Sequence, residues 1–171
     1  MKKTVHLVQQ KENVFYKIME SPIGTLLIET SKEALLSISF ADKGLMVAIE
    51  PAPHPILDEV IVQLKEYFAG QRSRFDIPLK CKGSDFEKKV WQATCEIPYG
   101  KTRSYGELAE SINNKKAYRA VGGALNKNPI PFIIPCHRIL KSDGSLGGYA
   151  FGESLKRRLL ELEGCCISLV K

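Results

Sequence analysis

Three short segments near the start of the chain are rich in branched and aromatic side chains, a composition typical of β-strands. They cover residues 14–19, 25–30 and 34–40, and the turn Ser21-Pro22-Ile23-Gly24 separates the first two. Strands this short, divided by turn residues, pair most simply with their neighbours along the chain. The pattern therefore predicts a small antiparallel meander.

Apolar residues then recur at helical spacing. Proline is favoured in the first turn of a helix and glycine directly after the last turn. We therefore predict a helix from about Pro55 to Gly70. Its apolar stripe comprises Leu57, Val60, Ile61, Leu64 and Phe68.

Two capping boxes mark helix starts in the second half of the chain. Ser84-Asp85-Phe86-Glu87 opens a helix that reaches about Cys95, and Ser104-Tyr105-Gly106-Glu107 opens one over about 105–112. In each box the serine side chain accepts a backbone N–H and the glutamate reaches back to the cap. Within the first helix we expect Trp91 and the Cys95 thiol to be buried.

A third helix is predicted from Lys115 to Asn126, after a break at Asn113-Asn114. Helix, short turn and basic helix form a helix-turn-helix pattern, which also occurs in helical hairpins that bind nothing. We expect the basic residues Lys115, Lys116 and Arg119 to point outwards. The inner face would carry Tyr118, Val121, Ala124 and Leu125.

Two adjacent glycines, Gly122 and Gly123, lie inside this third helix. Each costs about 1 kcal/mol relative to alanine in a helix interior. Glycine allows another backbone to come close, so we expect a neighbouring helix or a nucleic-acid groove at this position.

A glycine-rich loop over residues 141–152 and a last helix over about 153–163 complete the chain. The loop lacks the Gly-Lys-Ser/Thr pattern of a phosphate-binding loop. In the last helix we expect Lys156-Arg157-Arg158 to form a solvated face.

The predicted fold class is α+β, with a polar and then extended segment over residues 71–81 between two different patterns. A small N-terminal α/β domain with an antiparallel sheet would cover residues 1–82. A mostly helical C-terminal domain with a helix-turn-helix would cover residues 83–171. The first domain contains no catalytic constellation, so we interpret it as a scaffold.

Charge is distributed unevenly between these two parts. The chain carries 25 Lys and Arg against 19 Asp and Glu, a net charge of +6. Residues 1–80 hold ten of each sign, so the excess of 15 − 9 = 6 lies in residues 81–171. A basic half suggests a polyanionic partner, although this charge is also common among proteins that bind no nucleic acid.

The cysteine count argues against a disulfide framework and a zinc finger. There are five cysteines and no C-x-x-C pair, and neither His6 nor His54 has further ligands at metal-binding spacing. We therefore expect no metal and no cofactor. No secretory signal or membrane span is apparent, so we expect no membrane association and a cytoplasmic location, or a nuclear one in a eukaryotic host.

Candidate chemistry gathers at Ile134-Pro135-Cys136-His137-Arg138. Pro129, Pro131 and Pro135 exclude a regular helix and favour a rigid turn that presents Cys136. A nearby base such as His137 and a cation such as Arg138 could activate a thiol as a nucleophile. A buried structural cysteine beside a surface histidine is the alternative.

The run Pro135-Cys136-His137-Arg138, preceded by Arg119–Ala124 and Asn128-Pro129, resembles the O6-alkylguanine-DNA alkyltransferase family. The resemblance extends from about residue 86 to 164. It implies a suicide DNA-repair protein that moves an alkyl group from O6 of guanine, or possibly O4 of thymine, onto its own cysteine. It also implies that Cys136 is the acceptor, that His137 takes its proton through a water, that Glu163 orients His137, and that Asn128 holds the turn.

The same resemblance implies how DNA is bound. The third helix, with Gly122 and Gly123, would enter the minor groove of double-stranded DNA containing O6-alkylguanine. Arg119 would replace the flipped base, and Tyr105 would lie near a phosphate. Tyr149 and the backbone at Ala150 would contact the flipped guanine, where many relatives have serine in place of Ala150. We expect a monomer.

Three alternatives use the same residues. A cysteine hydrolase would use Cys136 and His137, but it would need turnover and would leave the helix-turn-helix unexplained. A lesion-binding relative without transfer activity would have replaced Cys136, often by tryptophan. A transcriptional regulator could use the same helix pair, but the chain has no room for a further regulatory domain.

Overall fold

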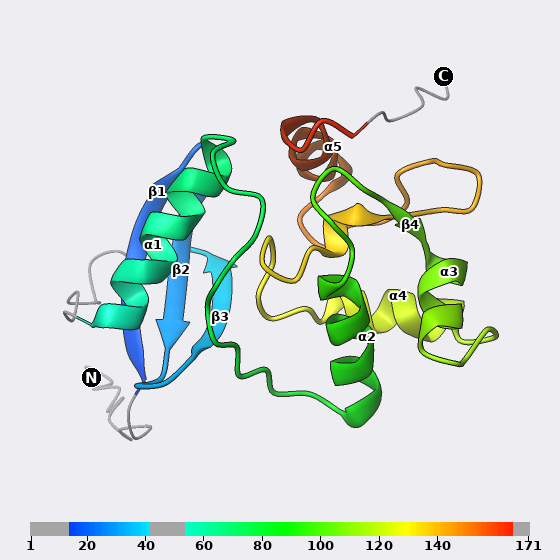
Figure 1. Cartoon of the computed structure of the whole chain (residues 1–171), viewed down its shortest axis with the longest axis horizontal. Coiled ribbons are helices and arrows are strands. Elements are labelled where there is room, and N and C mark those ends of the chain that lie inside the picture. Colours follow the sequence, from blue (N-terminus) through cyan, green and yellow to red (C-terminus); the bar gives the residue numbers. More distant parts are fainter. Residues whose placement is uncertain (1–13, 42–53, 166–171) are drawn as a thin grey trace, which may run out of the picture.

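The computed structural model describes residues 14–41 and 54–165. A sheet covered by one long helix lies at one end, and the remaining helices gather at the other (Figure 1). The strands are β1 (Phe15–Ser21), β2 (Gly24–Thr30) and β3 (Leu35–Phe40). They pair antiparallel in the order β1-β2-β3, which confirms the predicted meander.

Helix α1 (Pro55–Phe68) follows the predicted bounds. Proline occupies its first turn, and Gly70 adopts φ +71° just beyond its end. Its buried face includes Leu57, Val60, Leu64 and Tyr67 and forms one apolar core with the sheet.

Both capping boxes are formed, as predicted. They open α2 (Asp85–Cys95) and α3 (Tyr105–Ser111), and α4 (Tyr118–Asn126) packs against both helices. Trp91 is buried as expected, and its Nε1–H donates to the Ala124 carbonyl at 2.8 Å, which links α2 to α4. The predicted α+β fold, with a helix-turn-helix formed by α3 and α4, is confirmed.

The start of α4 differs from the prediction. The helix begins at Tyr118 rather than Lys115, because Asn113 turns the chain with φ +59° and Ala117 donates back to the Asn114 carbonyl. Val121, Ala124 and Leu125 form the buried face as expected. Tyr118 was predicted on that face but is 48% exposed.

Two burial predictions were also wrong. Lys156, expected in a solvated face, is fully buried, because the backbone carbonyls of Ile139 and of the glycine-rich loop accept its ammonium hydrogens. Cys95, expected to be buried, is exposed at the end of α2. His6 and Cys166 lie outside the described residues.

The segment before Cys136 packs between the two ends of the molecule. Ile130, Phe132 and Ile134 belong to the same core as the sheet and α1, and the Ile38 N–H of β3 donates to the Pro129 carbonyl at 2.9 Å. A 3₁₀ turn η2 (Cys136–Arg138) then leads into β5 (Ile139–Leu140), which pairs parallel with β4 (Arg103–Ser104).

Helix α5 (Glu153–Leu162) packs against η2. None of the helices within the described ranges is long and apolar enough to cross a membrane.

Candidate active site around Cys136

Asn128 holds the Cys136 turn from inside. Its Nδ2 donates to the Ile134 carbonyl at 2.8 Å and to the Cys136 sulfur at 3.0 Å, and its Oδ1 accepts from the Ile130 N–H at 3.0 Å. Cys136 is 6% exposed. The turn thus presents one buried thiol, as the prolines predicted.

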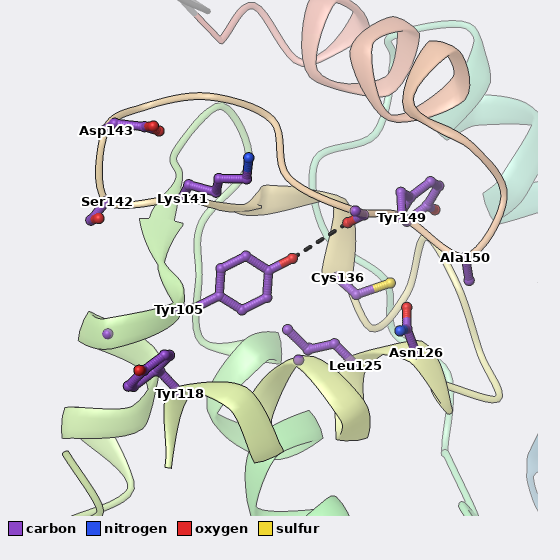
Figure 2. A pocket seen from close by; sticks show the side chains of 13 residues that line it. Tyr105, Tyr118, Leu125, Asn126, Cys136, Lys141, Ser142, Asp143, Tyr149 and Ala150 are labelled. Carbon is purple, nitrogen blue, oxygen red and sulfur yellow. Dashed lines mark hydrogen bonds between the residues drawn. The ribbon is translucent and has the colours of Figure 1, made fainter. Parts of the chain in front are cut away.

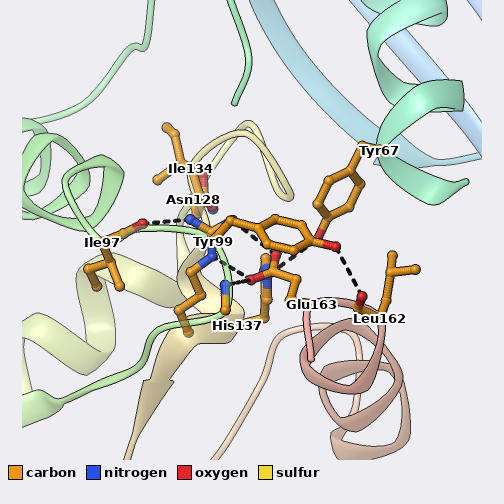
Figure 3. Close-up of polar contacts among 10 residues, drawn as sticks. Tyr67, Ile97, Tyr99, Asn128, Ile134, His137, Leu162 and Glu163 are labelled. Carbon is orange, nitrogen blue, oxygen red and sulfur yellow. Dashed lines mark hydrogen bonds and ion pairs between the residues drawn. The ribbon is translucent and has the colours of Figure 1, made fainter. Parts of the chain in front are cut away.

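Behind the thiol, His137 and Glu163 form a buried pair (Figure 3). The His137 Nε2 lies 2.8 Å from Glu163 Oε1, and both side chains are inaccessible to solvent. Glu163 is the C-cap of α5, where the negative end of the helix disfavours a carboxylate unless it has a partner. The structure brings together Cys136, His137, Glu163 and Asn128 as the sequence analysis expected.

Arg138 supplies the positive charge in this network. Its Nε donates to Glu163 Oε2 at 2.8 Å and its Nη2 donates to Oε1 at 3.0 Å. Its Nη1 donates to the Ile97 carbonyl at 2.6 Å. Arg138 therefore binds the carboxylate behind His137, and not the thiol that the sequence analysis expected it to activate.

Tyr67 completes the network and was missed by sequence reasoning. Its hydroxyl, which comes from α1, donates to Glu163 Oε1 at 2.7 Å and lies 3.5 Å from His137 Nε2. The available signal was a tyrosine within an otherwise apolar helix stripe, since buried tyrosine hydroxyls usually have a hydrogen-bond partner.

The pKa shifts identify the resting protonation states. Burial raises the pKa of Glu163, but hydrogen bonds from His137 and Arg138 outweigh it and bring the pKa to about 2. Burial lowers the pKa of His137 against the opposing effect of Glu163. Burial also raises the pKa of the Cys136 thiol, although the Asn128 hydrogen bond lowers it. The resting site holds a thiol, a neutral imidazole and a carboxylate.

These states fix the histidine tautomer. Because Glu163 is ionised, Nε2 of His137 carries the hydrogen and donates it. Nδ1 is then the basic nitrogen, and it is buried without a hydrogen-bond partner among the described residues. Nδ1 is available to accept a proton.

On its other side, Cys136 faces a cavity of about 590 Å³ between α3, α4 and the glycine-rich loop. The sulfur points between Tyr149, Ala150 and Asn126, with Tyr105 across the cavity (Figure 2). The Tyr149 hydroxyl is buried, and its interaction with the Cys136 sulfur partly offsets the rise that burial causes in the pKa of the thiol. The cavity is mainly apolar with a few polar groups, the usual character of a small-molecule or nucleobase site.

The glycine-rich loop forms one wall of the cavity, and contacts of three side chains fix it. The Tyr105 hydroxyl donates to the Gly148 carbonyl at 3.4 Å. The Lys156 ammonium donates to the carbonyls of Ile139 and Leu146, and its Nζ lies 3.5 Å from that of Gly148. Phe151 packs edge-on against Tyr149, with ring centroids 5.6 Å apart. The wall is therefore held in place before any substrate binds.

The predicted DNA-binding residues divide between the cavity and the outer surface. Tyr105 and Gly122 line the cavity, and a Cβ added at Gly122 would lie 3.7 Å from the Tyr105 ring. A Cβ at Gly123 would meet nothing within 4 Å, so no part of the described protein explains that glycine. Arg119 is exposed on α4 and does not line the cavity.

No group of three or more potential metal ligands occurs within residues 14–41 and 54–165. The site therefore consists of a thiol with a histidine–carboxylate pair on one side and a cavity of about 590 Å³ beside a helix-turn-helix on the other. That combination defines a class of proteins that react through cysteine next to a nucleic-acid-binding motif.

Comparison with known proteins identifies the family. Residues 85–165 match the family described as 6-O-methylguanine DNA methyltransferase, DNA binding domain, and residues 14–81 match its ribonuclease-like domain. The chain belongs to the 6-O-methylguanine DNA methyltransferase family.

Individual relatives are similar to this chain in sequence and structure over most of its length. A methylated-DNA–protein-cysteine methyltransferase of Methanosarcina acetivorans is 44% identical over 90% of this chain and 100% of its own length. The crystal structure of Mycobacterium tuberculosis O6-methylguanine methyltransferase is 41% identical, with a TM-score of 0.77 over 88% of this chain and 92% of that one. A structure described as Mycobacterium tuberculosis OGT in complex with DNA is 42% identical, with a TM-score of 0.78 over 86% and 91%.

Proposed function

We propose that this protein repairs DNA by direct reversal, moving an alkyl group from O6 of guanine to its own Cys136. The observation that supports this most strongly is the position of Cys136, which lines a cavity large enough to admit a base and adjoins the buried His137–Glu163 pair. Family membership supports the same chemistry, because the named relatives are methylated-DNA–protein-cysteine methyltransferases.

The reaction is one displacement at the alkyl carbon. Nδ1 of His137 takes the thiol proton through a water, because the two neighbouring side chains form no direct hydrogen bond with each other in the described structure. The sulfur of Cys136 then bonds to the alkyl carbon as the carbon–O6 bond breaks, and the electron pair passes to guanine. Guanine takes up one proton as it leaves, which balances the thiol proton that His137 accepted and later returns to water, and Glu163 stabilises the His137 imidazolium meanwhile.

Cys136 is consumed in the process. The product is a thioether, which water does not hydrolyse under mild conditions, and no further residue acts to restore the thiol. Each molecule therefore acts once. A cysteine hydrolase built on the same pair would instead release its product and turn over.

DNA binding places the lesion in the cavity. A base within a duplex cannot reach a thiol inside a protein, so the nucleotide is extruded at a cost of a few kcal/mol. We propose that α4 lies in the minor groove, with Gly123 against the DNA backbone and Arg119 in place of the extruded base. The open space at Gly123 and the exposure of Arg119 support this arrangement.

We further propose that residues 1–82 form the scaffold domain and residues 83–171 the acceptor domain, and that the protein acts as a monomer. The extended chain between α1 and α2 supports this division. We expect the protein in the compartment that holds the DNA, which is the cytoplasm or a eukaryotic nucleus.

The experiment is a titration of the protein into a fixed amount of duplex containing one O6-methylguanine. We expect lesions to disappear in a one-to-one ratio with protein, and the variant Cys136→Ala to bind the duplex without removing any. Removal of many lesions per protein would indicate a catalytic hydrolase, and binding without removal would indicate a damage sensor.

A further inference from the structure

Tyr118 is a large aromatic side chain without a place in the protein core. It is 48% exposed in the first turn of α4, one of three large hydrophobic residues exposed in the described parts of the chain. The other two, Val62 and Leu79, lie away from the Cys136 cavity, whereas Tyr118 forms part of its lining. An exposed aromatic ring beside a reactive cavity suggests contact with a partner.

The Tyr118 ring also contacts the side chain of Arg119. The guanidinium carbon of Arg119 lies 5.6 Å from the centroid of the Tyr118 ring, within the range of a cation–π interaction. Arg119 makes no ion pair among the described residues. The ring therefore limits where the arginine can lie before any partner binds.

Two glycines lie close to this pair on α4. Gly122, one turn after Tyr118, lies on the same side of α4 and also lines the cavity. At Gly123 an added Cβ would meet nothing. Helix α4 thus carries an exposed aromatic ring at Tyr118, a cation at Arg119 and uncovered backbone at Gly123.

DNA is the occupant that fits these features. An exposed aromatic ring can stack on a base or pack on a sugar, and a guanidinium binds phosphate or stacks on a base. Gly123, where an added Cβ would meet nothing within 4 Å, leaves room for a groove to approach. The Cys136 thiol, deeper in the same cavity, is the group to which the extruded base must be delivered.

We propose that Tyr118 is a DNA-contact residue, which orients Arg119 at the mouth of the cavity and packs against the duplex beside the extruded nucleotide. This rests on the proposed function and adds a residue to its DNA-binding surface. Tyr118 is a positioning residue for the transfer, since its ring acts on the DNA and on Arg119 rather than on the reacting atoms.

The test compares Tyr118→Ala, Tyr118→Leu and Tyr118→Phe with the wild type in single-turnover transfer from duplex O6-methylguanine. Removing one stacked aromatic contact should slow transfer at limiting DNA by about five- to 100-fold in Tyr118→Ala. Tyr118→Leu should also be slow, because it keeps apolar bulk but no π face. Tyr118→Phe should react at nearly the wild-type rate. Val62→Ala, a truncation at an equally exposed site on α1, should change nothing.

A second readout separates DNA contact from a role in the cavity. Without DNA, iodoacetamide should alkylate Cys136: the sulfur bonds to the reagent carbon, iodide leaves and the thiol proton passes to water. Peptide mass spectrometry of the Cys136 peptide measures the rate. Because Tyr118 lines the end of the cavity away from the Cys136 sulfur (Figure 2), we expect the three variants to change the rate of this reaction far less than they change the rate of duplex transfer. Unchanged duplex transfer in Tyr118→Ala, or equal slowing of both reactions, would overturn the proposal. Failure of wild-type transfer would instead refute the proposed function.

Discussion

The two sides of Cys136 differ in almost every physical respect. Behind the sulfur, His137, Arg138 and Glu163 are buried and joined by hydrogen bonds no longer than 3.0 Å. In front of it lies an open cavity with tyrosine, glycine and alanine in its lining. The buried side can control a proton, because its charges are fixed and shielded from water. The open side can admit a base, because most of its lining is small, apolar or aromatic, with Asn126, Lys141 and Asp143 among its few polar groups.

The N-terminal half contributes one aromatic residue to each side. Tyr67 of α1 donates to Glu163 on the buried side. On the open side, Phe40 of β3 packs on Phe151 with ring centroids 5.1 Å apart, and Phe151 packs on Tyr149. The predicted scaffold therefore supports both the proton-accepting network and the wall of the cavity.

Neutralising the buried Glu163 carboxylate should have the largest effect on stability and on transfer. Glu163→Gln keeps the shape of the side chain but leaves Arg138 buried without its counter-charge. Removing one partner of such a pair typically lowers the free energy of unfolding by about 3–5 kcal/mol. Urea denaturation measures the loss, and single-turnover transfer should slow as well, because the His137 imidazolium is no longer stabilised.

Glu153→Gln is the matched control for that variant. Glu153 lies on the same helix and pairs with Arg157 at 3.8 Å on the surface. Exposed pairs contribute about 0–1 kcal/mol, so its stability and transfer rate should hardly change. Equal stability and equal transfer rates in Glu163→Gln and Glu153→Gln would show that the buried network contributes no more than the exposed ion pair.

A smaller effect should follow from Tyr67→Phe, which removes a hydroxyl bound to the carboxylate at 2.7 Å. Hydrogen bonds to charged groups contribute about 1.5–3 kcal/mol, so the free energy of unfolding should fall by about that amount. Tyr16→Phe, on the partly exposed strand β1, should leave it unchanged. If the two variants were equally stable, Tyr67 would not belong to the network.

A still smaller effect should come from Phe40→Leu on the open side. The lost aromatic pair contributes about 0.5–1.5 kcal/mol beyond area burial. We expect a modest loss of stability and a several-fold slower transfer at saturating DNA, since the Tyr149 wall is less firmly held. Phe15→Leu is the control. It removes a ring from the same sheet, but that ring stacks on His54, with centroids 4.3 Å apart, and not on the cavity wall. It should lose similar stability but keep its transfer rate.

The smallest effect concerns pH. Because burial lowers the pKa of His137 below 6.5, its imidazole stays neutral as the pH falls through 6.5. Single-turnover transfer at saturating DNA should therefore not decrease there. Stability should fall below pH 6.5, because only the unfolded state then takes up the His137 proton. A loss of transfer with an apparent pKa of 6.5 would mean that His137 is exposed to solvent.

Sequence reasoning succeeded where the signals are local. The capping boxes at Ser84 and Ser104, the branched and aromatic composition of the strands and the stripe of α1 all depend on residues that are close together in the sequence. The break at Asn113-Asn114 was predicted, but the start of α4 was misplaced. The further turn in which the Ala117 N–H donates to the Asn114 carbonyl is specified by no short pattern. With the start misplaced, Tyr118 was assigned to the wrong face.

The buried network could not be derived in this way. His137 and Glu163 are 26 residues apart, and Tyr67 and Glu163 are 96 apart. Family resemblance supplied the first pair. For the second, the tyrosine within an apolar helix stripe indicates a hydrogen-bond partner but not which residue provides it. Lys156 was misjudged because a buried lysine is stable only where carbonyls from other segments accept its hydrogens.

The central claim is that the thiol between these two sides is the alkyl acceptor. The most direct test uses a duplex whose O6-methylguanine carries a deuterated methyl group, followed by peptide mass spectrometry of the protein. We predict one deuterated methyl group on the peptide containing Cys136, none on any other cysteine peptide, and none anywhere in Cys136→Ser. A label on another cysteine, or lesion loss without a label on the protein, would contradict the account.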